Sequence, residues 1–154
     1  MGNIRLNKFV TDDLEIIVKR PVAKFPNAEP VGEREWGSED LLVLSPGNYT
    51  MKRLFVRAGK KGGLQYHRRK DEASYIISGR MILRYENEEA DLVEKEVGPG
   101  DWFHFPSGCI HQEIAITDVV RIEVSTPHFN DRVRVEGMFG IEDKDGLPTT
   151  EESE

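Results

Sequence analysis

The sequence lacks the features of several common protein classes. It has a single cysteine, Cys109, in 154 residues, which excludes an internal disulfide and favours a reducing compartment. No apolar run approaches the roughly 20 residues of a membrane span, and the N-terminal residues lack the apolar core of a signal peptide. The net charge is −7 and no block of basic residues occurs, which argues against nucleic acid as a partner. These absences predict a cytoplasmic protein that binds neither a membrane nor nucleic acid.

Long helical periodicity is also missing. The apolar runs are short and mostly alternate, and Gly/Pro turns separate them, as at residues 45–48, 98–100 and 106–108. Such a pattern predicts an all-β antiparallel sandwich or barrel. The predicted strands cover residues 14–18, 41–44, 49–56, 74–77, 81–85, 102–105, 110–116 and 119–124.

The chain is short enough for one domain, and its 38% hydrophobic residues can form a single core. Residues 19–37 contain Pro21, Pro26 and Pro30 and are predicted to form a loop. We therefore divide the sequence into an N-terminal strand and loop segment at 1–31, a barrel at 32–141 and a tail at 142–154. The tail is acidic and poor in apolar residues, which predicts disorder.

Two spaced patterns combine turn formers with residues that can bind a metal. The first covers residues 59–79 and the second covers residues 100–111. Residues 65 and 67 are two apart, so on a strand their side chains point to the same face. One amide oxygen, one carboxylate and two imidazoles could converge inside a small barrel, from Gln65, His67, Glu72 and His111. This donor set suits a borderline divalent metal better than calcium or magnesium.

Both patterns resemble the two motifs of the cupin superfamily, with Gln65 in place of the first histidine of the usual His-x-His pair. Further segments are similar to the cupin domain of type II mannose-6-phosphate isomerases; they lie at residues 34–37, 49–54, 64–67, 122–124 and 131–140. The resemblance covers about residues 32–140 and implies a single-domain cupin, a jelly-roll barrel also called a double-stranded β-helix. It further implies a homodimer and one divalent metal ion, for which we favour zinc over manganese, iron or nickel.

The isomerase chemistry implied by the resemblance moves a proton between adjacent carbons, which requires an acid/base group near the metal. The candidates are Glu113, Glu123 and Lys52. Glu113 is two residues after His111, so it shares the same strand face. An anionic substrate could be held by the arginines among the strands, for which the candidates are Arg53, Arg121 and Arg134. For any one of the acid/base candidates, a solvent-facing or salt-bridged charge is the more common explanation. Ordinary surface charge explains the basic residues almost as well.

Three departures from the isomerase pattern bear on the substrate. Lys70 stands where the family has an arginine, Ile114 and Ala115 replace an expected Glu-Asn, and residues 137–141 replace the Asp-x-Tyr-Gly-Arg stretch. The predicted function is therefore a metal-dependent cupin isomerase or epimerase acting on a small sugar derivative, either a sugar phosphate or a nucleotide sugar. The alternatives are a metal-dependent dioxygenase or lyase on a small organic acid, and a non-catalytic sugar- or anion-binding cupin.

Overall fold

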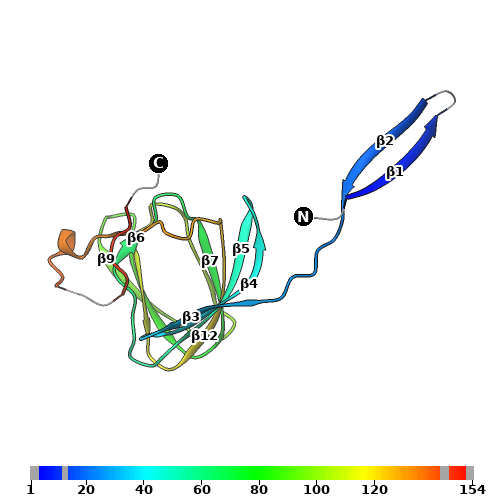
Figure 1. The fold of residues 1–154 in the computed structure, drawn as a ribbon. Helices are drawn as coiled ribbons and strands as arrows, with labels where there is room; N and C mark the ends of the chain where they lie inside the picture. The colour runs from blue at the N-terminus through cyan, green and yellow to red at the C-terminus, as the bar shows by residue number, and fades with distance from the viewer. Residues whose placement is uncertain (1–3, 12–13, 143–145, 152–154) are drawn as a thin grey trace.

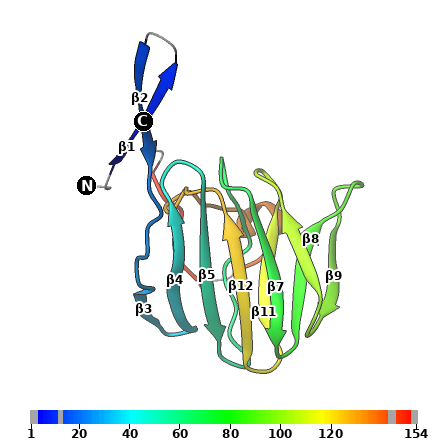
Figure 2. The same cartoon turned by 90° about the vertical axis from the view of Figure 1, so that its right-hand side faces the viewer.

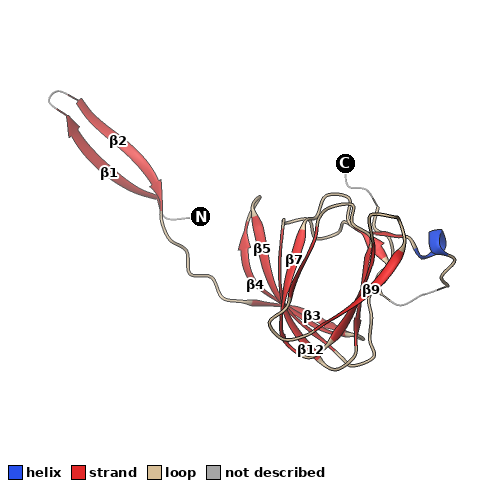
Figure 3. Cartoon of the chain, turned by 180° about the vertical axis from the view of Figure 1, so that it is seen from behind, coloured by secondary structure: helices blue, strands red, loops and turns tan. Residues whose placement is uncertain are grey.

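The structure is a computed structural model and describes residues 4–11, 14–142 and 146–151. Nearly all of its regular structure is strand (Figure 3), as predicted, with one short 3₁₀ helix, η1, at Glu136–Phe139. No helix in the described part of the chain is long and apolar enough to cross a bilayer. The strands are β1 Ile4–Thr11, β2 Leu14–Pro21, β3 Glu29–Arg34, β4 Gly37–Ser45, β5 Tyr49–Val56, β6 Gln65–Tyr66, β7 Glu72–Ser78, β8 Met81–Glu86, β9 Leu92–Val97, β10 Trp102–Phe105, β11 His111–Ala115, β12 Val119–Ser125 and β13 Val133–Arg134.

Two antiparallel sheets pack face to face and form the barrel (Figures 1 and 2). One has the order β10-β7-β12-β5-β4-β3 and the other has the order β13-β6-β11-β8-β9. Strands that are far apart in sequence pair with one another, as β12 does with β5 and β7. This arrangement confirms the predicted all-β jelly roll.

The barrel interior changes from apolar to polar along its strands. At one end, β7, β12 and β11 contribute Ile76, Val119 and Ala115 to a buried apolar core, which also contains Met81, Leu83, Val97 and Phe105. Since side chains alternate between the two faces of a strand, the next inward positions of β7 and β12 are Ser74 and Arg121. The apolar end supplies the burial that stabilises the fold, whereas the polar end leaves ionisable side chains facing a cavity.

The N-terminal segment contains more strand than predicted. β1 and β2 form an antiparallel hairpin that extends away from the barrel (Figure 1). The prediction that residues 19–37 form only a loop is wrong in part, because β2 continues to Pro21 and β3 passes through Pro30. β3 is an edge strand with an irregular register beside Pro30, and an edge position tolerates a residue without a backbone N–H.

Part of the acidic tail lies beside β13. The backbone N–H of Thr150 donates to Arg132 O at 3.0 Å, and the Thr149 hydroxyl accepts from the backbone N–H of Arg134 at 3.0 Å. The Arg68 guanidinium donates to Thr150 O at 3.0 Å. These contacts place residues 146–151 next to the barrel. That the tail is disordered in solution stays a prediction.

Candidate metal centre

Two histidines and one glutamate meet at the polar end of the barrel. Glu72 is the first residue of β7, His111 is the first residue of β11, and His67 directly follows β6. Glu72 Oε1 lies 3.1 Å from His111 Nε2 and 3.4 Å from His67 Nε2. All three side chains are buried, and one potential ligand atom from each lies within 4.8 Å of the other two. The three residues, called the triad below, could hold one metal ion between the two sheets.

The other ring nitrogen of each histidine is fixed by the backbone. His67 Nδ1 bonds to the carbonyl oxygen of Asp131, and His111 Nδ1 bonds to that of Cys109 at 2.9 Å. A carbonyl oxygen only accepts, so each Nδ1 must carry the proton. A neutral imidazole then turns its Nε2 lone pair towards Glu72 Oε1, and three electron-rich atoms face one another. A divalent cation fits this donor set, and backbone-anchored imidazoles are usual around bound metals.

Phe105 contributes to the position of His111. The two rings are stacked, with centroids 4.1 Å apart and an interplanar angle of 17°. Phe105 belongs to the apolar core, so the His111 ring packs against the apolar end of the barrel.

Lys70 connects the triad to a second buried carboxylate. Its ammonium forms ion pairs with Glu72 and, at 2.9 Å, with Glu123. Burial alone would lower the pKa of Lys70, but these two carboxylates raise it above the usual lysine range. Burial alone would likewise raise the pKa of Glu72, whereas the charge of the Lys70 ammonium holds it well below its usual range. Glu72 is therefore ionised, as a metal ligand must be.

The loop that carries His67 and Lys70 is tied to a distant segment. Both carboxylate oxygens of Asp131 accept backbone N–H bonds from this loop, from Arg68 at 3.2 Å, Arg69 at 2.6 Å and Lys70 at 2.8 Å. Burial would raise the pKa of Asp131, but these three donors lower it. Since Asp131 O also holds His67, this one residue orients both ends of the loop.

A second ion pair lies deeper in the barrel. Arg121 Nη2 lies 2.7 Å from Glu113 Oε2, and Arg121 Nη1 lies 3.3 Å from Glu123 Oε2. Burial raises the pKa of Glu113, although the Arg121 guanidinium opposes the shift. Glu123 has two cationic partners and Glu113 has one, so Glu113 is the less strongly neutralised of the two candidate bases.

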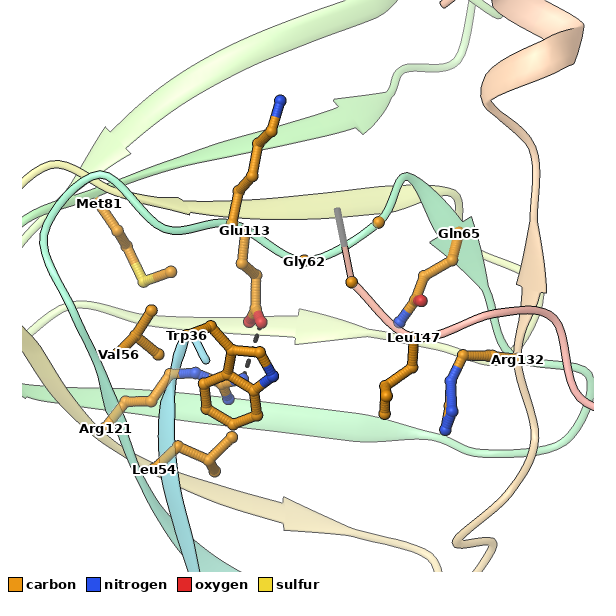
Figure 4. Close-up of a pocket in the computed structure, with 13 residues that line it drawn as sticks. Trp36, Leu54, Val56, Gly62, Gln65, Met81, Glu113, Arg121, Arg132 and Leu147 are labelled. Carbon is orange, nitrogen blue, oxygen red and sulfur yellow. Dashed lines mark hydrogen bonds and ion pairs between the residues drawn. The ribbon is translucent and has the colours of Figure 1, made fainter. Parts of the chain in front are cut away.

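The cavity consists of two neighbouring pockets that share part of their walls. The metal chamber, of about 150 Å³, is lined by the triad, Lys52, Lys70 and Glu123. The side chamber, of about 130 Å³, is lined by Trp36, Leu54, Val56 and Met81. Both are bordered by Gln65, Glu113, Arg121, Arg132 and Leu147. Figure 4 shows the side chamber, with Gln65, Leu147 and Arg132 on one side, Met81 and Val56 on the other, and the Glu113–Arg121 pair between them.

Charges in the metal chamber nearly balance. Four basic and five acidic side chains line it, namely Lys52, Lys70, Arg121 and Arg132 against Glu39, Glu72, Glu113, Glu123 and Asp131. With neutral histidines, the lining therefore has one excess negative charge. A bound divalent cation would turn this into one excess positive charge, which favours an anionic ligand.

Most of the predicted site residues meet in this cavity. Gln65 is paired directly with His111 between β6 and β11, so both side chains are on the same sheet face, but ligation by Gln65 stays a prediction. Lys52 lines the metal chamber and forms an ion pair with Glu39 at 3.0 Å. Arg53 points outward, with its side chain 55% exposed, and pairs with Asp40 at 2.7 Å. Arg134 pairs with buried Glu136 and is not among the residues that line either chamber.

Sequence reasoning missed three residues of the cavity. Trp36 and Leu147 line the side chamber, and Arg132 borders both chambers. Their segments are remote from the two metal-binding patterns, and nothing in their local sequence indicates that these side chains face the cavity. Lys70 attracted notice only as a replacement for an arginine, because its bonds to Glu72 and Glu123 depend on the packing of two strands.

Comparisons with known proteins support the assignment of the barrel to the cupin fold. Residues 53–125 match the family described as "Cupin domain". Among solved structures, KdgF from a Halomonas species has a TM-score of 0.57 and 19% identity, over 66% of this chain and 88% of that one. An RmlC-like cupin from Shewanella frigidimarina has a TM-score of 0.53 and 19% identity, over 65% and 82% of the two chains.

The capsular polysaccharide assembling protein CapF from Staphylococcus aureus is also similar, with a TM-score of 0.61 and 20% identity. The match covers 73% of this chain and 32% of CapF, so this chain corresponds to about a third of that protein. No curated protein matches the sequence. At these identities the structures show the fold alone. Together with the match of residues 53–125, they support a cupin fold for this barrel.

Proposed function

We propose that this protein is a metal-dependent cupin isomerase or epimerase that acts on a small sugar derivative. The observation that carries the proposal is the buried triad, in which Glu72 Oε1 lies 3.1 and 3.4 Å from two imidazole nitrogens. His67, Glu72 and His111 would hold the metal, with Gln65 as a fourth ligand, and zinc is the ion we favour. Bound there, the metal would act as a Lewis acid on a hydroxyl or carbonyl oxygen of the substrate.

The carboxylate of Glu113 is the proposed base. It borders the metal chamber two residues after His111 and on the same strand face, so a substrate at the triad would present a carbon-bound proton towards it. Its burial raises its pKa, which brings it nearer to the range that suits a general base at neutral pH. Arg121, 2.7 Å away, would hold Glu113 in position and stabilise negative charge that develops on the substrate.

Sugar chemistry is supported by the sequence resemblance to mannose-6-phosphate isomerases and by the structural likeness to a capsular polysaccharide assembling protein. Neither likeness specifies a substrate for this chain. We therefore propose only the class of the substrate, a small sugar derivative that carries hydroxyl and carbonyl groups.

A non-catalytic sugar- or anion-binding cupin is the second candidate. One observation favours it: Glu113, Glu123 and Lys52, the three predicted acid/base side chains, are all engaged in ion pairs. A binding module needs the cavity and its charges but no available base.

The test begins with metal analysis of the purified protein. We expect about one divalent ion per chain, its loss in the H67A/H111A double variant, and its retention in the control His104→Ala. His104 is an exposed histidine on β10 that pairs with Asp71, away from the triad. Full metal content in the double variant would contradict the proposed centre.

Catalysis is then measured as solvent deuterium exchange into members of a sugar-phosphate and nucleotide-sugar panel, followed by NMR. The Glu113→Gln variant keeps the shape of the side chain, so its metal content should persist while exchange falls by roughly 10²–10⁴-fold. Unchanged exchange would remove Glu113 from the role. Binding without exchange in the wild-type protein would favour the non-catalytic candidate.

A further inference from the structure

We propose that Arg132 recognises an anionic group of the ligand, so that the cavity accepts a small sugar derivative with a carboxylate or a phosphate in preference to a neutral sugar. This inference rests on the proposed function only in locating the ligand at the triad. It names a ligand class that the metal centre by itself does not determine.

The ion pairs of the metal chamber single out Arg132. Lys52 is neutralised by Glu39, Lys70 by Glu72 and Glu123, and Arg121 by Glu113 and Glu123. Within residues 4–11, 14–142 and 146–151, no hydrogen bond or ion pair engages the Arg132 guanidinium, although its backbone N–H donates to Thr150. Burial lowers the pKa of Arg132, and the charge of Glu39 offsets this only in part. A half-buried guanidinium that no described residue hydrogen-bonds or pairs with is an unfavourable arrangement, which an anionic ligand would relieve.

A second donor borders the same cavity. Arg121 is 4% exposed, and its Nε is buried without a hydrogen-bond partner in the described structure. Arg121 and Arg132 both border the metal chamber and the side chamber (Figure 4), so a ligand that occupies both chambers passes both guanidinium groups. The planar guanidinium has the geometry to bind the oxygens of a carboxylate or phosphate in pairs.

The rest of the cavity limits the size and character of the ligand. The side chamber presents the apolar side chains of Trp36, Leu54, Val56 and Met81, against which the carbon skeleton of a sugar can pack. The chambers measure about 130 and 150 Å³. A cavity of about 150 Å³ holds one benzene molecule, so the two together suit a compound with about six carbons and one acidic group. With a divalent cation bound, the excess positive charge of the metal chamber favours that acidic group.

Titration calorimetry on the metal-loaded protein tests the proposal with ligand pairs that differ in the acidic group. Galacturonate is compared with galactose, and mannose 6-phosphate with mannose, so one pair probes a carboxylate and the other a phosphate. We expect at least one acid to bind more tightly than its neutral partner. Arg132→Gln should weaken that acid by roughly 10- to 100-fold, the usual effect of losing a charge-assisted hydrogen bond. Arg132→Lys keeps the positive charge but loses the planar guanidinium, so its affinity for the acid should lie between those of wild type and Arg132→Gln.

The control is Arg80→Gln, which removes the same charge from an exposed pair with Glu96 and should leave affinity unchanged. The proposal is overturned if no acid binds, if neutral sugars bind as tightly as the acids, or if Arg132→Gln and wild type bind the acid equally. Metal content and deuterium exchange are measured separately. A protein that prefers acids through Arg132 but shows no exchange would therefore contradict the isomerase proposal and leave this inference standing.

Discussion

Replacement of Arg121 by methionine should destabilise the protein strongly, because it leaves the Glu113 carboxylate without its cation and the Glu123 carboxylate with Lys70 alone. Arg121 is 4% exposed and bonds to Glu113 at 2.7 Å, to Glu123 at 3.3 Å and to Ser74 Oγ at 2.5 Å. Removing one partner of a buried ion pair typically costs about 3–5 kcal/mol. For a chain of this size that corresponds to a decrease in Tm of roughly 6–20 °C. Methionine keeps most of the side-chain volume, so loss of packing contributes little.

Urea denaturation at pH 7, followed by circular dichroism, measures the free energy of unfolding. The matched control is Arg53→Met, which breaks an exposed pair with Asp40 and should cost no more than about 1 kcal/mol. A double-mutant cycle isolates the pair: R121M/E113Q should be less destabilised than the sum of its single variants, because the uncharged amide no longer needs a cation. Equal losses in Arg121→Met and Arg53→Met, or strict additivity in the cycle, would refute the reasoning.

Two further predictions concern the C-terminal part of the chain. Burial would raise the pKa of Glu136, but Arg134 and backbone N–H groups, including that of Leu64, lower it below the unfolded value. A carboxyl group whose pKa is lower in the folded state stabilises the fold at pH values above its unfolded pKa. This stabilisation is lost as the pH falls through the folded pKa. The stability gap between wild type and Glu136→Gln in urea denaturation should therefore be largest at pH 7 and shrink below about pH 4; a constant gap would contradict this. Deletion of residues 143–154 should change Tm by a few degrees at most, since ordering these residues costs about as much as their few hydrogen bonds return. In a chain of this length each kcal/mol of lost stability lowers Tm by about 2–4 °C. A decrease of more than about 10 °C in scanning calorimetry would therefore show that the tail stabilises the fold by several kcal/mol, against the prediction.

Local sequence predicts the fold and the metal centre better than it predicts the rest of the cavity. Turn formers at fixed offsets place Glu72 and His111 at the starts of β7 and β11, so their meeting could be anticipated from spacing. Alternation likewise placed Glu113 on the same face as His111. Arg53 and Arg134 show the limit of this approach, since basic residues on strands look alike in sequence, whereas only pairing reveals that Asp40 and Glu136 neutralise them.

The remaining cavity residues depend on contacts between distant segments. Arg132 follows Asp131, whose carboxylate holds the loop of Arg68, Arg69 and Lys70, and this closure cannot be inferred from either segment alone. The prediction omitted β3 because Pro30 argues against a strand. Proline is excluded from central strands but is tolerated in an edge strand such as β3.

The position of the side-chamber residues along the chain has a consequence for how such proteins diversify. The triad, Lys70, Glu113 and Arg121 all lie within residues 53–125, the part that matches the cupin family. Trp36, Arg132 and Leu147 lie in the flanking segments, before and after it. Part of the cavity wall, including the proposed recognition residue Arg132, thus comes from outside the family-matched stretch and meets the triad only in the folded barrel. Grafting the flanks of one relative onto the centre of another should therefore alter ligand choice, provided that the graft keeps Asp131, which holds His67 and the loop of Lys70.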